Sequence, residues 1–144
     1  MSQENVEVVR KAIEAWNSGD AEAALAYADP DIEVREDPTL PDAEVFHGTA
    51  GLLASVAKGT EVLGKVRYEP EEFLDLGERV LIVLRLIGRG THSGAPVDQR
   101  ICQLWTLRNG RVVCLESFFH LAHALDAAGL SQDDGYSSWL EPRS

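Results

Sequence analysis

The chain has 144 residues, of which 13 are Lys or Arg and 24 are Asp or Glu, so its formal net charge is -11. This charge repels nucleic acid and anionic membrane surfaces, and we expect neither as a partner. A hydrophobic content of 44% and a charged content of 26% are typical of a globular domain, and no apolar run approaches the ~20 residues of a membrane span.

The first residues of the chain and its cysteines lead us to expect a cytoplasmic protein. The first residues are acidic and polar, without the pattern of a signal peptide. Cys102 and Cys114 are too few for a disulfide framework, and we expect both to be reduced thiols. We predict one domain over residues 1–130, followed by a polar tail over 131–144 that includes Tyr136 and Trp139.

The first half of the chain predicts helices. Apolar residues at helical spacing indicate a helix over about residues 2–18, which Gly19 ends. Asp20 can cap a second helix over 21–28, and a third helix is expected over 48–63. A first strand, about 32–36, lies between the second and third helices.

The second half predicts strands and one short helix. The strands are expected at about 66–76, 79–90, 96–108 and 111–120, with the helix over 121–128. A run of helices followed by a run of strands indicates an α+β fold with an antiparallel sheet. Such a sheet buries one face against its helices.

Asn109-Gly110 sets the expected strand register, because Asn-Gly between two strands predicts a two-residue hairpin turn. If the ladder is regular, Gln103 lies opposite Glu116, with His120 further along the same face. A carboxyl group in an apolar pocket is expected to have a raised pKa. Two interpretations stay open: a Gln-Glu hydrogen bond that only fixes the sheet, or a polar group that lines a pocket.

Four short motifs carry a family resemblance: AWNSGD at 15–20, ADPDIE at 28–33, FHG at 46–48 and LRNGRVV at 107–113. They resemble the nuclear transport factor 2-like superfamily, in particular its SnoaL-like and ketosteroid-isomerase-like branches. The resemblance implies a cone-shaped α+β domain in which three to four helices pack on a strongly curved antiparallel sheet that encloses a pocket. It also implies a homodimer through the outer sheet face, which we place around Arg85, Arg100, Thr106 and Ser117.

The resemblance supplies candidates for acid/base chemistry. Asp37, followed by Pro38, stands where ketosteroid isomerases place their general base, and SnoaL-type cyclases use an acid/base near the last strand, where His120 and Glu116 lie. Ketosteroid isomerases also use a tyrosine on the first helix as a hydrogen-bond donor to the oxyanion. The corresponding position of this chain holds Ala12, which cannot donate such a bond. Classical steroid isomerisation is therefore not expected.

These observations give one set of candidate site residues. The catalytic candidates are Asp37, His120 and Glu116, and the expected ligand-binding residues are Trp16, Tyr27, Leu84, Gln103, Trp105 and Phe118. His120 and His123 lack a convergent set of further ligands, so neither a metal nor a cofactor is expected.

The expected function is binding of a small hydrophobic molecule that is polyketide-, terpenoid- or steroid-like. One form of this hypothesis is a cofactor-independent isomerase, cyclase or dehydratase, and the alternative is a non-catalytic ligand-binding or dimerisation module. A carboxylate or histidine that faces the cavity would favour the enzyme, whereas a wholly apolar cavity would favour the binding protein.

Overall fold

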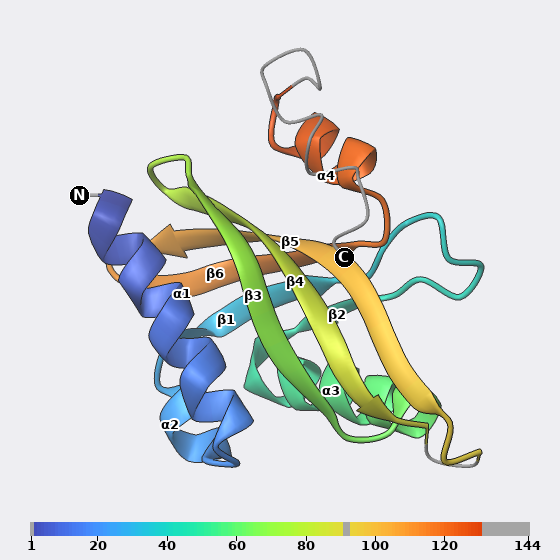
Figure 1. The fold of residues 1–144 in the computed structure, drawn as a ribbon. Helices are drawn as coiled ribbons and strands as arrows, with labels where there is room; N and C mark the ends of the chain where they lie inside the picture. Colours follow the sequence, from blue (N-terminus) through green and yellow to red (C-terminus); the bar gives the residue numbers. More distant parts are fainter. Residues whose placement is uncertain (1, 91–92, 131–144) are drawn as a thin grey trace.

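One twisted six-stranded sheet runs through the computed structural model, which describes residues 2–90 and 93–130 (Figure 1). The strand order across the sheet is β2-β1-β6-β5-β4-β3. The elements in chain order are α1 (Ser2–Asn17), α2 (Ala21–Leu25), β1 (Ala28–Arg35), β2 (Val45–His47), α3 (Gly48–Leu63), β3 (Val66–Asp75), β4 (Arg79–Arg89), β5 (Pro96–Arg108), β6 (Arg111–Phe118) and α4 (Leu121–Ala127). This is the expected α+β fold, and its sheet does not close into a barrel.

The predicted order of helices is confirmed, with ends that follow from local chemistry. Gly19 takes a positive φ of 85°, which glycine adopts without steric cost, and α1 ends two residues earlier. The Asp20 side chain then accepts a hydrogen bond from the Ala23 N–H at 3.0 Å and caps α2. In Figure 1, α4 stands at the opposite end of the sheet from α2 and α3.

The sheet is mixed, whereas the sequence predicted an antiparallel one. β1 pairs with β6 in the parallel direction, and the short strand β2 adds to the outer edge of β1. A parallel pair needs a long crossover connection, and the stretch from α3 through β5 supplies it here. The order of the elements along the chain does not reveal which strand β1 joins.

The predicted hairpin is present, but a β-bulge changes the register beyond it. Arg108 pairs with Arg111 across the turn, and Asn109 and Gly110 have φ values of 54° and 75°. Leu107 then pairs with Val112, whereas Thr106 pairs with Cys114, so one residue of β6 has no partner.

The bulge overturns the predicted cross-strand pair of Gln103 and Glu116. Gln103 instead lies opposite Ser117, and Glu116 lies opposite Leu104. A one-residue shift moves every later side chain of the strand to the other face of the sheet. The Glu116 carboxylate is thereby kept out of an apolar layer, where its burial would be costly.

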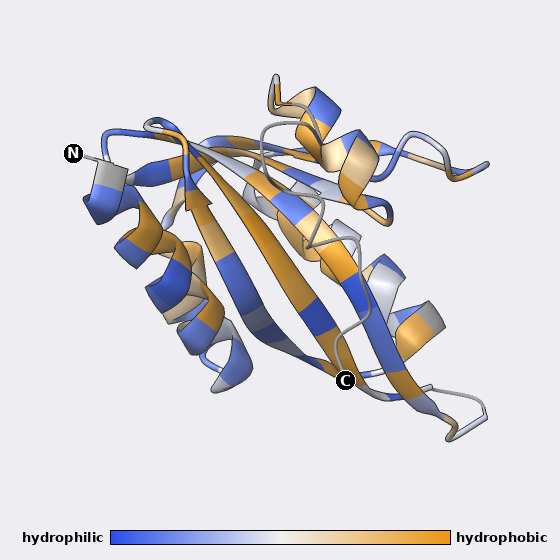
Figure 2. Cartoon of the chain, turned by 45° about the horizontal axis from the view of Figure 1, so that its top comes forward, coloured by the Kyte–Doolittle hydropathy of each residue, from blue (hydrophilic) through white to orange (hydrophobic). Residues whose placement is uncertain are grey.

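Hydrophobic residues are frequent along the central strands (Figure 2), and the sheet buries apolar side chains on both of its faces. We call the face that packs against α1 the inner face, and the face beneath α4 the outer face. The inner cluster contains Val9, Ile13, Ile82, Leu84, Trp105 and others. The outer cluster contains Leu81, Val83, Cys102, Leu104 and Phe118, covered by Leu121, Ala124, Leu125 and Ala128 of the α4 region.

The outer face differs from the dimer surface that the sequence predicted, because of both the bulge and α4. Ser117 lies on the inner face opposite Gln103, and α4 already covers the most apolar part of the outer face. The remaining outer face carries the ion pairs Arg85–Asp98 and Arg100–Glu71. The homodimer stays a prediction, and the predicted tail over 131–144 lies outside the described residues.

No helix in the described ranges is both long and apolar enough to cross a lipid bilayer.

Candidate functional site

An apolar cavity of about 100 Å³ lies on the inner face, between the sheet and the helices α1, α2 and α3. Its lining residues are Ala12, Ile13, Trp16, Ala24, Leu25, Tyr27, Ala28, Ile32, Leu52, Val56, Tyr68, Gln103, Trp105, Val112 and Leu115. A cavity of roughly 150 Å³ suffices for benzene, and complete small-molecule sites span roughly 300–1,000 Å³. As it stands, the cavity therefore matches about one ring or a short branched chain.

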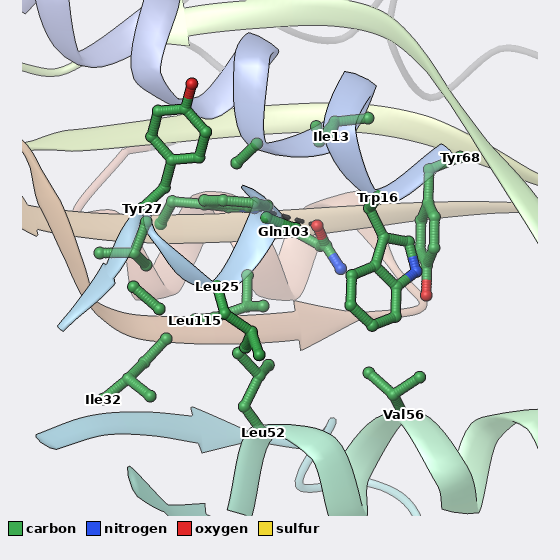
Figure 3. Close-up of a pocket in the computed structure, with 15 residues that line it drawn as sticks. Ile13, Trp16, Leu25, Tyr27, Ile32, Leu52, Val56, Tyr68, Gln103 and Leu115 are labelled. Atoms are coloured by element: carbon green, nitrogen blue, oxygen red, sulfur yellow. Dashed lines mark hydrogen bonds between the residues drawn. The ribbon is translucent and has the colours of Figure 1, made fainter. Parts of the chain in front are cut away.

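Gln103 reaches this cavity from β5, and it is only 8% exposed. Its Oε1 accepts a hydrogen bond from the Trp105 Nε1–H at 2.9 Å, while its Nε2 lies 3.5 Å from the Ser117 Oγ. The bond from Trp105 fixes which end of the amide is the carbonyl, because an indole N–H can only donate. Figure 3 shows the amide nitrogen directed toward the part of the cavity lined by Trp16 and Tyr68.

Tyr68 and Trp16 bring two more hydrogen-bond donors to the same cavity (Figure 3). Burial raises the pKa of the Tyr68 hydroxyl, which therefore stays protonated at neutral pH and can donate. Within the part of the chain that the structure describes, neither this hydroxyl nor the Trp16 indole N–H makes a hydrogen bond. The cavity wall thus contains three side chains that carry hydrogen-bond donors: Gln103, Tyr68 and Trp16.

Asn17 fixes the position of Tyr68. Its Nδ2 donates to the Tyr68 carbonyl oxygen at 2.7 Å, and its Oδ1 accepts from the Tyr68 N–H at 2.9 Å. The last residue of α1 is thereby joined to β3 at the point where Tyr68 enters the cavity wall. This pairing gives a structural reason for the asparagine in the AWNSGD motif.

Four of the predicted ligand-binding residues line the cavity: Trp16, Tyr27, Gln103 and Trp105. Leu84 is fully buried in the inner cluster but does not reach the cavity surface. Tyr68 was missed by the sequence analysis. The sequence pattern that could have identified Tyr68 is the alternation of residues along β3, which places it on the same face of the strand as Val66.

Two of the remaining candidates lie on the outer face, so the prediction that they line the pocket is wrong. The bulge sends Glu116 and Phe118 outward to a cleft that Arg35 and His123 also line. There the Arg35 Nη1 donates to the Glu116 Oε1 at 3.1 Å. The Glu116 carboxylate is therefore held in an ion pair on the outer face, away from the cavity.

His120 and Asp37 also lie away from the cavity. His120 is the residue that precedes α4, and its ring meets the His123 ring edge-on with centroids 5.2 Å apart. Asp37 is 1% exposed and accepts hydrogen bonds from the Phe119 N–H at 2.8 Å, the Thr39 N–H at 2.9 Å and the Thr39 hydroxyl at 2.7 Å. Burial alone would raise the pKa of Asp37, but these three bonds outweigh it and lower the pKa.

The arrangement of the cavity suits binding better than proton transfer. Among its lining residues, all of which are described, none is a carboxylate or a histidine. The described residues also contain no group of three or more metal-ligating side chains that could hold a metal ion. What the cavity offers is apolar surface with donors from Gln103, Tyr68 and Trp16, which complement a ligand oxygen that accepts hydrogen bonds.

Residues 9–115 match the model of the SnoaL-like domain family. The chain belongs to this family. Three solved structures show how this SnoaL-like chain compares with others of the NTF2-like fold. An NTF2-like protein from Burkholderia xenovorans LB400 is 30% identical, with a TM-score of 0.66, and the match covers 81% of this chain and 88% of that one.

The other two structures share the fold at lower sequence identity. TerC, co-crystallised with polyporic acid, is 23% identical with a TM-score of 0.72, over 85% of this chain and 96% of that one. A proposed SnoaL-like polyketide cyclase from Jannaschia sp. CCS1 is 21% identical with a TM-score of 0.70, over 81% and 85% of the two chains. No curated protein matches the sequence.

Proposed function

We propose that this SnoaL-like protein binds a small hydrophobic molecule that carries a carbonyl or similar acceptor oxygen, in the cavity of the inner face. The observation that carries this proposal is the buried amide of Gln103. Its carbonyl accepts from Trp105, whereas its NH₂ group makes only a long bond of 3.5 Å to the Ser117 hydroxyl and is directed toward the cavity. A buried donor that lacks a good partner costs free energy, and an acceptor oxygen on a ligand would relieve that cost.

The ligand class follows from the size and lining of the cavity. The aromatic side chains Trp16, Tyr27, Tyr68 and Trp105 favour a flat unsaturated ring. The fold is shared with TerC, which was co-crystallised with polyporic acid, and with the proposed polyketide cyclase from Jannaschia. We therefore place polyketide-like and other aromatic ketones first among the ligand classes.

Binding ranks ahead of acid/base catalysis because of where the titratable groups lie. A general base must come within hydrogen-bonding reach of the proton that it removes. Asp37 is engaged by three donors of its own, and Glu116 faces the outer cleft. The enzyme hypothesis with Asp37, Glu116 and His120 stays a prediction, whose test is the turnover of Asp37→Asn and His120→Ala variants once a reaction is found.

The binding proposal is tested by NMR titration with two probes of nearly equal shape, acetophenone and α-methylstyrene. The ketone should bind about three- to tenfold more tightly, because only its oxygen accepts hydrogen bonds from the cavity donors. Tyr68→Phe should reduce this preference without changing the affinity for α-methylstyrene. Equal affinity of the two probes, or no binding of either at millimolar concentration, would contradict the proposal.

A cavity-filling variant locates the binding site. Ala24 lines the cavity from α2, so Ala24→Leu should abolish the binding of both probes while the protein stays folded. Ala26→Leu is the matched control, since Ala26 follows the same helix and is exposed. Unchanged binding in Ala24→Leu would place the ligand elsewhere.

A further inference from the structure

Helix α3 forms the wall of the cavity opposite α1, and it is anchored more weakly than that helix, although both have 16 residues. Leu52 and Val56 of α3 lie four residues apart on one helix face and line the cavity together with Trp16 of α1 (Figure 3). Among the α3 residues whose side chains are described, none is buried, whereas four residues of α1 are buried. The wall that α3 provides is therefore held by half-buried contacts.

The sequence of α3 gives the helix little stability of its own. Gly51 and Gly59 lie inside it, and a glycine within a helix costs about 0.5–1 kcal/mol relative to alanine. In the helix as described, the N-cap residue His47 makes no side-chain capping bond, and the first turn has no acidic residue and the last turn no basic one. Packing against the rest of the protein must therefore hold α3 in place.

The two ends of α3 allow the helix to shift. Gly48 begins it with a φ of 75°, and Gly64 follows its last residue with a φ of 77°. Glycine adopts such angles without steric cost, and positions of this kind absorb the backbone changes of a moving segment. Between the ends, the Lys58 Nζ lies 2.7 Å from the Glu36 Oε1. A lysine side chain is long and flexible, so this contact can persist while the helix shifts.

The size of the cavity indicates which ligands would require such a shift. At about 100 Å³ it matches one ring, whereas complete small-molecule sites span roughly 300–1,000 Å³. The sheet and α1 are fixed walls, because their lining residues Ile13, Gln103 and Trp105 are buried. The walls without buried residues are α3 and the short helix α2, so the cavity can enlarge only on their side.

We propose that α3 is a movable wall and that the ligand is a ketone with two fused rings, which is larger than the cavity in this structure. This inference rests on the binding function proposed above. The first ring lies in the present cavity, with its carbonyl oxygen at the Gln103 amide, and the second ring displaces Leu52 and Val56 together with α3. Burial of the second ring offsets the half-buried contacts that α3 gives up.

Two ketones that differ by one fused ring, acetophenone and 2-acetonaphthone, test the ligand class in an NMR titration. We expect 2-acetonaphthone to bind at least as tightly as acetophenone, because its second ring buries additional apolar surface. A rigid cavity of the present size would instead reject the larger ketone.

A pair of variants locates the second ring. Leu52→Ala provides room before the ligand arrives, so it should raise the preference for 2-acetonaphthone over acetophenone about three- to tenfold. Leu53→Ala is the matched control, because Leu53 is the next residue of the helix, is 43% exposed and does not line the cavity. It should leave the preference unchanged.

Movement of α3 is measured as the distance between two spin labels. One label is attached at Leu53→Cys on α3 and the other at Lys11→Cys on the exposed side of α1, in a Cys102→Ala, Cys114→Ser background. Binding of 2-acetonaphthone should lengthen this distance by about 1–2 Å or more, and acetophenone should leave it unchanged. Labels at Lys11→Cys and Asp126→Cys, on α1 and α4, are the control, and neither ketone should change their separation.

The outcomes separate the two proposals. If 2-acetonaphthone binds while the distance between the α1 and α3 labels stays constant, or if Leu52→Ala behaves like Leu53→Ala, the movable wall is refuted. If acetophenone binds and 2-acetonaphthone does not, the two-ring ligand class is refuted while the binding function stands. If neither ketone binds, the binding function itself is refuted, and this inference with it.

Discussion

Asp37 and Gln103 are the buried polar side chains of the described residues, and they differ in how completely they are satisfied. Asp37 accepts three hydrogen bonds from the protein itself, so its carboxylate joins the start of the loop after β1 to the end of β6. Gln103 accepts one strong bond from Trp105, and its NH₂ group makes only a long bond of 3.5 Å to the Ser117 hydroxyl while it faces the cavity. The first pattern is that of a structural group and the second that of a binding group.

Asp37→Asn should therefore lower stability. The amide replaces one acceptor oxygen by a donor that faces backbone N–H groups, and the expected loss is about 1–3 kcal/mol in the free energy of unfolding at pH 7. Urea denaturation measures this loss. Asp31→Asn, which removes an exposed carboxylate, is the control and should change stability little. Equal stability of both variants and the wild type would contradict the structural role.

The loss should depend on pH in a defined direction. Burial acts to raise the pKa of Asp37, but the bonds from Phe119 and Thr39 lower it overall. A carboxyl with a lowered pKa in the folded state stabilises the fold above its unfolded pKa, about 3.9 for aspartate. This contribution is lost as the pH falls through the folded pKa. The difference between the wild type and Asp37→Asn should therefore be full at pH 7 and shrink in acid.

The sequence identified Asp37 as special but not what it does. Its position before Pro38 and its family resemblance were readable, whereas its donor Phe119 is 82 residues away. The same limit applies to Gln103, whose place in the cavity was predicted from alternation but with the wrong neighbour. Strand alternation gives the face of a residue, and only the assembled sheet gives its partners.

At the scale of elements, Asn17 couples α1 to β3. It makes two hydrogen bonds to the backbone of Tyr68, 51 residues away, and so positions a side chain that lines the cavity. The AWNSGD motif was evident in the sequence as a helix end. Its second role could not be derived there, because the contact depends on how β3 packs against α1.

Asn17→Ala should lower both stability and ligand affinity. Removing the side chain leaves the Tyr68 N–H and carbonyl without partners, at a cost of about 1–3 kcal/mol. Urea denaturation and titration with acetophenone measure the two effects. The control is Asn5→Ala, which removes one exposed bond to the Gly77 carbonyl at 2.8 Å. If the two variants lost equal stability and affinity, Asn17 would have no positioning role.

The β5–β6 hairpin shows why the candidate site was only partly predictable. Asn109-Gly110 correctly predicted the turn, since its two positive φ angles suit these residues. The bulge that follows carries no comparable local signal. It forms because Leu115 then faces Trp105 on the inner side, while Glu116 meets Arg35 outside. Tertiary packing therefore decides whether Leu115 or Glu116 faces the inner side of the sheet.

At the scale of the whole molecule, helices cover both faces of the sheet, but the inner face is covered by more helices than the outer face. The inner face packs against α1 and encloses the cavity together with α2 and α3, whereas the outer cluster depends on α4, a helix of 7 residues. Arg79 secures this helix by donating to the carbonyl oxygens of Ala127 and Ala128 at 3.3 Å and 3.0 Å. Docking of α4 therefore covers the apolar cluster of the outer face within the chain itself.

This arrangement predicts that α4 can be released without loss of the inner cavity. Cys102 lies beneath it, and burial raises its pKa to about 11, so its thiol should react slowly with a disulfide reagent at pH 8. Leu125→Ala removes the most buried leucine of α4 and should accelerate the reaction at least about tenfold, because opening of α4 becomes about 1.4 kcal/mol or more easier.

The measurement uses a Cys114→Ser background, so that a single thiol is followed. Asp126→Ala, on the exposed side of the same helix, is the control and should leave the rate unchanged. Binding of acetophenone should persist in Leu125→Ala, since the cavity lies on the other face of the sheet. If Leu125→Ala instead lost ligand binding and thiol protection together, the two faces would unfold as one unit. Equal rates in the two variants would show that α4 does not protect Cys102.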